Sequence, residues 1–111
     1  MTDCIFCKIS KGEIPSTKVF ESDKVFAFLD INPKAKTHIL VVPKKHIESV
    51  KTLQAEDKDI VSEMIFVAKE IAEKEGLGGY KLVFNVGRDG GQIVDHLHLH
   101  LLSGDVADLP V

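Results

Sequence analysis

The segment 96–102, His-Leu-His-Leu-His-Leu-Leu, constrains the fold more than any other part of the chain. Side chains alternate between the two faces of a β-strand, so a strand here places His96, His98 and His100 on one face. The alternating leucines then lie on the opposite face and need a second apolar layer to cover them. Histidines two residues apart in a strand are separated by about 6.5–7 Å. The pattern therefore predicts a strand with one chemically active face and one core face.

An amphipathic helix supplies the cover that the leucines need. Between Lys58 and Gly76 the apolar side chains recur with a helical period, and acidic and basic residues occupy the other face. Glycines at 76, 78 and 79 end the pattern. The apolar stripe consists of Ile60, Met64, Val67, Ala68 and Ile71.

Four other segments have the composition of strands. Residues 17–21 and 24–29 are joined by a short polar link that suits a hairpin, and 37–42 and 80–86 are also apolar. Strands with short connections favour antiparallel pairing, so the fold class is expected to be α+β, a five-stranded antiparallel sheet with helices on one face. A length of 111 residues predicts a single domain over 1–111.

The charge pattern and hydropathy exclude some partners. The 14 basic and 17 acidic residues are spread along the chain and give a net charge of −3, so no nucleic-acid polymer is expected as a partner. No apolar run approaches the roughly 20 residues of a membrane span, and the first residues do not resemble a signal peptide. We therefore expect a cytoplasmic protein.

The histidine row suits phosphoryl chemistry. Imidazole titrates near neutrality, so one neutral ring can attack phosphorus while its neighbour contacts a phosphate oxygen or the leaving group. The glycine-rich loop 87–92 directly precedes the row, and its backbone N–H groups can converge on an anion. The alternatives are a row of exposed polar residues or a plain metal site for the histidines, and an ordinary turn for the loop.

The only two cysteines, Cys4 and Cys7, form a C-x-x-C pair. A thioredoxin-like redox pair is expected within a βαβ unit, which this chain lacks. Two cysteines cannot complete a four-coordinate structural zinc site, so histidines must supply the remaining ligands, and His46 and His96 are the candidates. Two free thiols remain the alternative.

These motifs together resemble a known family. Segment 96–102 matches the signature of the histidine triad superfamily, and nearly the whole chain is similar to its Hint (histidine triad nucleotide-binding) branch. The further segments that carry this resemblance, in family order, are 5–9, 12–15, 37–38, 42–46 and 89–92.

The resemblance implies a HIT-like fold with a short N-terminal helix and a homodimer. It also implies binding of purine nucleoside monophosphates and hydrolysis of purine nucleoside phosphoramidates such as adenosine 5′-phosphoramidate. His98 then forms a nucleotidyl-histidine intermediate that water cleaves, and His100 and His38 complete the polar cluster around the phosphate. No cofactor is required for this chemistry. The alternative activity within the superfamily is hydrolysis of dinucleoside polyphosphates.

The resemblance also assigns a nucleotide pocket and a structural zinc site. Asp30 is assigned to the ribose hydroxyls, although from the sequence alone it could equally be a turn residue. The residues assigned to the phosphate are Asn85, Gly91, Gln92 and Ile93. Those assigned to the base are Phe6, Phe28, Ile31 and Leu40. The zinc ligands are Cys4, Cys7, His46 and His96.

Two features depart from the family pattern. One is the tail 105–111, which lacks the aromatic residues by which some Hint proteins reach the partner's site. The other is residue 93. After Gly-Gln the family often has Ser or Thr, whose hydroxyl can contact the phosphate or leaving group, but this chain has Ile93. The change leaves open a nucleotide-binding or interaction module with weak catalysis. A zinc-linked redox sensor is a further alternative.

Overall fold

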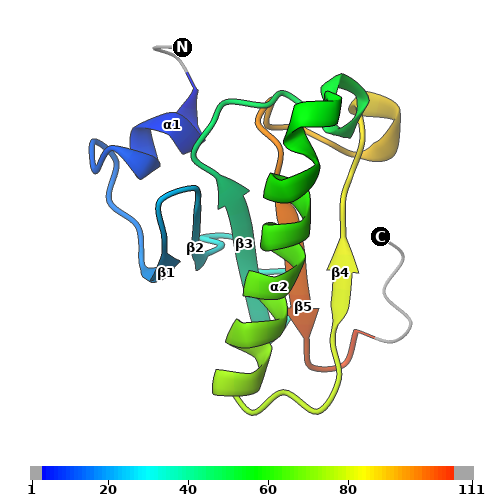
Figure 1. Ribbon diagram of the computed structural model, residues 1–111. Helices are drawn as coiled ribbons and strands as arrows, with labels where there is room; N and C mark the ends of the chain where they lie inside the picture. Colours follow the sequence, from blue (N-terminus) through cyan, green and yellow to red (C-terminus); the bar gives the residue numbers. More distant parts are fainter. Residues whose placement is uncertain (1–3, 107–111) are drawn as a thin grey trace.

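The computed structural model describes residues 4–106, which form a five-stranded antiparallel sheet and two α-helices (Figure 1). The strand order is β1-β2-β3-β5-β4. The strands are β1 (Lys18–Glu21), β2 (Val25–Leu29), β3 (Thr37–Pro43), β4 (Lys81–Val83) and β5 (Leu99–Ser103). The helices are α1 (Ile5–Ser10) and α2 (Lys58–Lys74), and 3-10 turns occupy Val50–Thr52, Ala55–Asp57 and Arg88–Gly90. The predicted α+β class and five-stranded sheet are confirmed.

Helix α2 covers the face of the sheet that carries the leucines (Figure 1). Alternate residues of β2 and β3 point into this layer, as do Leu97, Leu99 and Leu101. From α2 the layer receives Met64, Val67, Ala68 and Ile71, and the fifth predicted stripe residue, Ile60, packs against it while partly buried. The prediction that the leucines form the core face under this helix is therefore confirmed.

Helix α1 lies on the opposite face, so the expectation that the helices share one face is wrong. Phe6 and Ile9 of α1 are buried against Phe26, Phe28, Leu40 and Val42. The physical reason is visible in β2 and β3, which are apolar at consecutive positions and therefore need cover on both sides. The sequence thus builds one apolar layer under α2 and a smaller one under α1.

Helix α2 ends where the glycine pattern predicts. Gly76 adopts a φ of 69°, and the N–H groups of Gly76 and Leu77 bond to the carbonyls of Glu73 and Ala72. This pair of hydrogen bonds is a Schellman cap, which favours glycine at the left-handed position. Within residues 4–106, neither helix is both long enough and apolar enough to cross a membrane.

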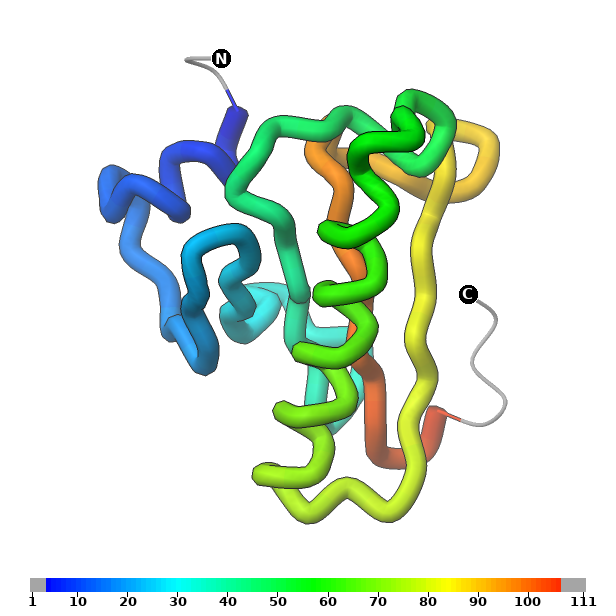
Figure 2. The backbone as a smooth tube through the Cα atoms, in the orientation of Figure 1, coloured from blue at the N-terminus to red at the C-terminus, as the bar shows by residue number. Residues whose placement is uncertain are grey.

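Strand β5 begins at Leu99, three residues later than the histidine pattern predicts. The N–H of Leu97 bonds to the carbonyl of Ile47 at 2.6 Å, so this stretch pairs with the loop after β3 instead of with a strand. Figure 2 shows these two segments meeting near the N-terminal end of α2. The predicted strand 80–86 is likewise shorter, at Lys81–Val83. His96 and His98 therefore lie in the loop that leads into β5.

Candidate functional site

The three histidines of the row lie on the α1 side of the sheet, where His96 and His100 belong to two separate clusters and His98 belongs to neither. The ring of Phe6 contacts the rings of both His96 and His98, at centroid distances of 5.8 and 5.1 Å. His98 in turn lies 4.9 Å from the ring of His100. His96 belongs to a sulfur-containing cluster, and His100 belongs to a cluster with His38 and Asp30.

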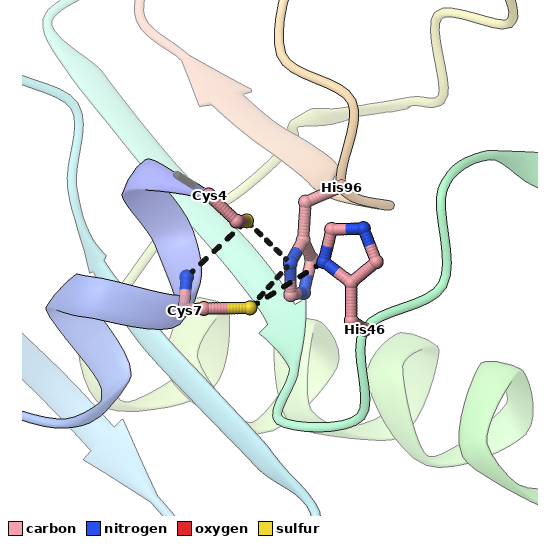
Figure 3. Close-up of side chains that lie close together, drawn as sticks. All are labelled: Cys4, Cys7, His46 and His96. Carbon is pink, nitrogen blue, oxygen red and sulfur yellow. Dashed lines mark hydrogen bonds between the residues drawn. The ribbon is translucent and has the colours of Figure 1, made fainter. Parts of the chain in front are cut away.

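The first cluster brings together the four predicted zinc ligands (Figure 3). Cys4 and Cys7 come from the start of α1, His46 from the loop after β3, and His96 from the segment before β5. The Nδ1 atom of His96 lies 3.2 Å from the Cys4 sulfur and 3.6 Å from the Cys7 sulfur. The Nδ1 atom of His46 lies 3.4 Å from the Cys7 sulfur.

This donor set has the dimensions of a tetrahedral zinc site. With Zn–S bonds of about 2.3 Å and Zn–N bonds of about 2.1 Å, sulfur and nitrogen at two tetrahedral corners lie about 3.6 Å apart. The ring of His96 is oriented for this role, because its Nε2–H donates to the carbonyl of Pro43 at 2.8 Å and leaves Nδ1 with a lone pair. Burial lowers the pKa of His96 to about 4, so the ring is neutral at physiological pH. The residues fit a metal of the zinc type.

His98 is held in one tautomer by the backbone. Its Nδ1 lies 2.7 Å from the carbonyl oxygen of His96, and a carbonyl can only accept, so Nδ1 carries the proton. The lone pair is therefore on Nε2, the atom that can act as a nucleophile. Burial lowers the pKa of His98 below its usual value, which keeps that lone pair unprotonated at neutral pH. The side chain has the state that nucleophilic attack requires.

The tautomers of His38 and His100 follow from one chain of hydrogen bonds. The backbone N–H of Lys34 donates to Nδ1 of His38, so the proton of the neutral His38 ring is on Nε2. His38 Nε2–H then donates to Nδ1 of His100 at 2.9 Å, which leaves His100 with its proton on Nε2. The cluster thus sets an N–H donor on the ring next to the His98 nucleophile.

The Asp30 carboxylate lies between the turn after β2 and the histidine cluster. One oxygen accepts the backbone N–H of Asn32 at 2.8 Å, as a turn aspartate does. The other oxygen lies 3.5 Å from Nε2 of His38 and thus faces the histidine cluster. The same side chain closes the turn after β2 and adds negative charge beside the imidazoles.

The buried neutral histidines give a pH-dependent stability. Burial, followed by the charges of His98 and His38, lowers the pKa of His100 from 6.5 to about 4. Between these values the unfolded chain takes up a proton that the folded chain does not, so stability falls as pH drops through this window. We expect the melting temperature to decrease from pH 6.5 to pH 4, with a shallower slope in His100→Asn. Identical slopes for the two proteins would contradict this assignment.

The residues predicted for the base divide into a buried and an exposed group. Phe6 and Phe28 contact each other edge to face at 5.6 Å, and Leu40 belongs to the same apolar cluster. Ile31 is 84% exposed and lies outside this cluster. The structure therefore brings three of the four residues together on the α1 side of the sheet, beside His98.

Hydrogen bonds from the side chain of Gln92 hold the glycine-rich loop in one conformation. The Gln92 side chain accepts from the N–H of Gly87 and donates to the carbonyls of Glu48 and Val94, so its polar atoms serve the loop itself. Gly91, with a φ of 89°, permits the turn, and Asn85 donates to the carbonyl of Gly90. Ile93 follows with its side chain 82% exposed. The backbone N–H of Gln92 also bonds to the carbonyl of Gly87 at 2.9 Å, so the N–H donors of Gln92 are all used within the protein.

Several positioning contacts were missed by the sequence reasoning. Arg88 forms a two-pronged ion pair with Asp95, at 2.8 and 3.0 Å, and its guanidinium also donates to the carbonyl of Gln92. This pair ties the glycine-rich loop to the residue just before His96. The spacing of seven residues across a loop has no periodic signal, so only the opposite charges could have suggested the pair.

Comparisons with known proteins place this geometry in a family. Residues 3–108 match the family profile described as "Scavenger mRNA decapping enzyme C-term binding". A HIT family hydrolase structure from Legionella pneumophila Philadelphia 1 superposes with a TM-score of 0.93 at 48% identity, covering 97% of this chain and 98% of that one. The chain is a member of the histidine triad family. A histidine triad protein from Clostridium difficile gives the same TM-score at 51% identity, with coverage of 100% and 96%.

Two curated relatives of this histidine triad protein have informative names. The Escherichia coli (strain K12) protein named purine nucleoside phosphoramidase is 48% identical over 104 residues, which cover 92% of this chain and 87% of that protein. The Zea mays protein named 14 kDa zinc-binding protein is 48% identical over 109 residues, which cover 96% and 85% of the two chains. The suspected family membership is confirmed.

Proposed function

We propose that this protein hydrolyses purine nucleoside phosphoramidates through a covalent nucleotidyl intermediate on His98. The observation that carries the proposal is the pair of adjacent neutral rings in complementary tautomers. His98 presents a lone pair on Nε2, and His100 presents an N–H on its own Nε2. The 48% identity with the phosphoramidase of Escherichia coli supports the substrate class.

The reaction proceeds in two displacements at phosphorus. In the first, His98 Nε2 attacks, a P–N bond to the histidine forms, and the P–N bond of the substrate breaks. The leaving nitrogen departs as the neutral amine after taking a proton from the solvent. The imidazolium that results keeps its Nδ1–H on the His96 carbonyl. In the second, water attacks phosphorus, and the P–N bond to His98 breaks. The water loses a proton, the nucleoside monophosphate leaves, and His98 returns to its neutral form.

His100 and His38 serve the phosphate during these steps. The Nε2–H of His100 donates to a non-bridging oxygen, where negative charge increases as the nucleophile adds. His38 holds His100 in the donor tautomer through the 2.9 Å hydrogen bond. The Asp30 carboxylate binds the ribose hydroxyls, with its second oxygen kept near His38.

With the nucleotide in this orientation, the remaining residues of the pocket contact the base and the phosphate. The purine base packs on the apolar cluster beside His98 and is partly covered by exposed Ile31. The residues proposed for the base are Phe6, Phe28, Ile31 and Leu40. The phosphate is surrounded by Asn85, Gly91, Gln92 and Ile93, where Ile93 contributes its backbone N–H and Gln92 holds the loop in shape.

A structural zinc ion is proposed at Cys4, Cys7, His46 and His96. All four positions of the tetrahedron are filled by protein atoms, so the metal has no open position for water. The name of the Zea mays relative supports zinc as the metal. Thiolate ligands persist in a reducing compartment, which is consistent with a cytoplasmic location. Metal analysis of the purified protein should give about one zinc per chain, the stoichiometry of a single such site.

A homodimer is proposed through β4 and the neighbouring part of α2. Strand β4 is an edge of the sheet, and an edge strand offers unpaired backbone groups to a second chain. Tyr80 and Leu82 in or next to β4, and Ile65 and Phe66 of α2, are exposed apolar side chains. Phe66 is the most exposed of these, at 66%. Sedimentation equilibrium measures the mass directly.

The substrate class is tested by comparing two reactions. We expect release of ammonia from adenosine 5′-phosphoramidate to be at least about tenfold faster, in kcat/KM, than cleavage of a dinucleoside polyphosphate, because one phosphate suffices for the contacts described. A reversed preference would assign the protein to the alternative activity. Binding of adenosine 5′-monophosphate without any turnover would support a binding module, for which the exposed Ile93 in place of a hydroxyl residue is the specific observation.

A further inference from the structure

Helix α1 is attached to the fold by few polar contacts. It has six residues, and its backbone hydrogen bonds stay within residues 4–14. Within residues 4–106, the polar contacts that join it to the rest of the chain run from Cys4 and Cys7 to His46 and His96. The other attachment is the apolar packing of Phe6 and Ile9. A helix this short has little stability of its own, so these anchors determine its position.

Phe6 lies between the two cysteines in sequence and between the two sites in space. Its ring meets His96 at 5.8 Å and His98 at 5.1 Å, in both cases edge to face. It also meets Phe28 at 5.6 Å. The same side chain thus contacts a candidate metal ligand, the candidate nucleophile and the apolar cluster assigned to the base. Anything that fixes α1 also fixes this wall of the nucleotide pocket.

We propose that metal binding at Cys4, Cys7, His46 and His96 is thermodynamically coupled to nucleotide binding through Phe6. The metal joins the start of α1 to two loops of the sheet and holds Phe6 against His98 and Phe28. Without the metal, α1 keeps its apolar packing and the weak Cys–His contacts but loses the bonds that join all four ligands to one atom, so nucleotide binding must then also order the helix. The proposal rests on the nucleotide-binding function proposed above.

The coupling must act in both directions. If metal raises the affinity for the nucleotide by some factor, the nucleotide raises the affinity for the metal by the same factor. If the metal orders α1 before the nucleotide arrives, the nucleotide no longer has to pay that entropy loss when it binds. Coupling of this kind requires no change in the average structure. The predicted effect is on affinity, and the chemistry at His98 does not enter it.

The test measures zinc affinity in the presence and absence of adenosine 5′-monophosphate. A chromophoric chelator is titrated into the zinc-loaded full chain, so that metal-free protein never has to be isolated. We expect saturating nucleotide to tighten zinc binding about tenfold, within the range typical of coupled sites. The reciprocal value comes from calorimetric titration of the nucleotide at two buffered zinc concentrations. Circular dichroism at the lower zinc concentration establishes that the chain is folded.

Two variants separate the proposed route from general stabilisation by a ligand. Phe6→Ala removes the ring and is expected to reduce the coupling factor to about onefold to twofold, the value for uncoupled sites. Ile5→Ala is the matched control, because Ile5 lies in the same helix between the cysteines but is 42% exposed and lies outside the apolar cluster. It should keep the tenfold factor. If the nucleotide merely stabilised the folded state, both variants would keep the factor.

The outcomes are distinct from those of the proposed hydrolysis. A tenfold factor that Phe6→Ala abolishes supports the coupling even if no turnover is detected. Equal zinc affinity with and without bound nucleotide overturns it, whether or not His98 is catalytic. A factor retained in Phe6→Ala also overturns it, as does a zinc affinity too weak to compete with the chelator. Failure of the nucleotide to bind zinc-loaded protein overturns both this coupling and the proposed function.

Discussion

His98→Asn should reduce turnover of adenosine 5′-phosphoramidate by on the order of a thousandfold or more, since the attacking atom itself is removed. Asparagine can still donate an amide N–H to the carbonyl of His96, the hydrogen bond that now holds the ring. It has no basic nitrogen to form the intermediate. The affinity for adenosine 5′-monophosphate should therefore remain within a few-fold of the parent. Steady-state kinetics and calorimetric titration measure the two quantities.

The matched control is Leu99→Met, one residue further along the same segment. Leu99 points into the layer under α2, away from the histidines, and methionine has a similar volume. This variant should keep kcat/KM within a few-fold of the parent. Turnover by His98→Asn at a comparable rate would show that His98 is not the nucleophile. Quenching the parent reaction with radiolabelled substrate in an alkaline denaturant should trap the nucleotidyl protein, because the phosphorus–imidazole bond is stable in base and labile in acid, and the variant should give no trapped label.

The sequence predicted those parts of the site that depend on periodicity. The alternation of histidine and leucine placed each set on its own face, and contacts of Leu97, Leu99 and Leu101 with the α2 layer confirm that placement. The helical stripe located α2 for the same reason. Both signals arise from the repeat of side-chain direction in regular structure, and that repeat can be read without knowing the fold. The C-x-x-C pair likewise indicated that distant histidines must join it.

The remaining features depend on contacts between loops, which have no period. The late start of β5, at Leu99, follows from the hydrogen bond between Leu97 and Ile47. The tautomer of His38 follows from the N–H of Lys34, and the tautomer of His98 from the carbonyl of His96. Backbone donors and acceptors are the same for every residue type, so the sequence holds no record of which one lies near a given imidazole. These contacts nevertheless decide which nitrogen is nucleophilic.

The position of α1 was misjudged for a related reason. A continuous apolar run such as Val25–Leu29 shows that a strand is buried, but it does not say what covers each face. Six residues at the N-terminus give too short a pattern to identify a helix that packs there. The cysteines were the better guide, because a shared metal site requires residues 4 and 7 to lie near His96.

Leu101→Ala should have the opposite effect to the histidine change, because it lowers stability and leaves the chemistry intact. Leu101 is fully buried between the sheet and α2, and its register partners are Ile39 on β3 and Leu82 on β4. Removing a buried leucine side chain costs about 2–5 kcal/mol, which is a large share of the roughly 5–15 kcal/mol that stabilises a typical domain. The urea midpoint should fall accordingly, with little change in the slope of the transition.

The control for this loss is Leu29→Ala, at the end of β2, where the leucine is 41% exposed. Its cost should stay below about 1 kcal/mol, since little apolar area is returned to water. All variants are compared at one protein and zinc concentration, because association and metal binding shift the unfolding midpoint. Folded Leu101→Ala should turn over substrate near the parent rate below its melting temperature. If instead activity fell with no loss of stability, the leucine face would not be separate from the chemistry. The alternation in 96–102 would then not divide the segment into a core face and a reactive face.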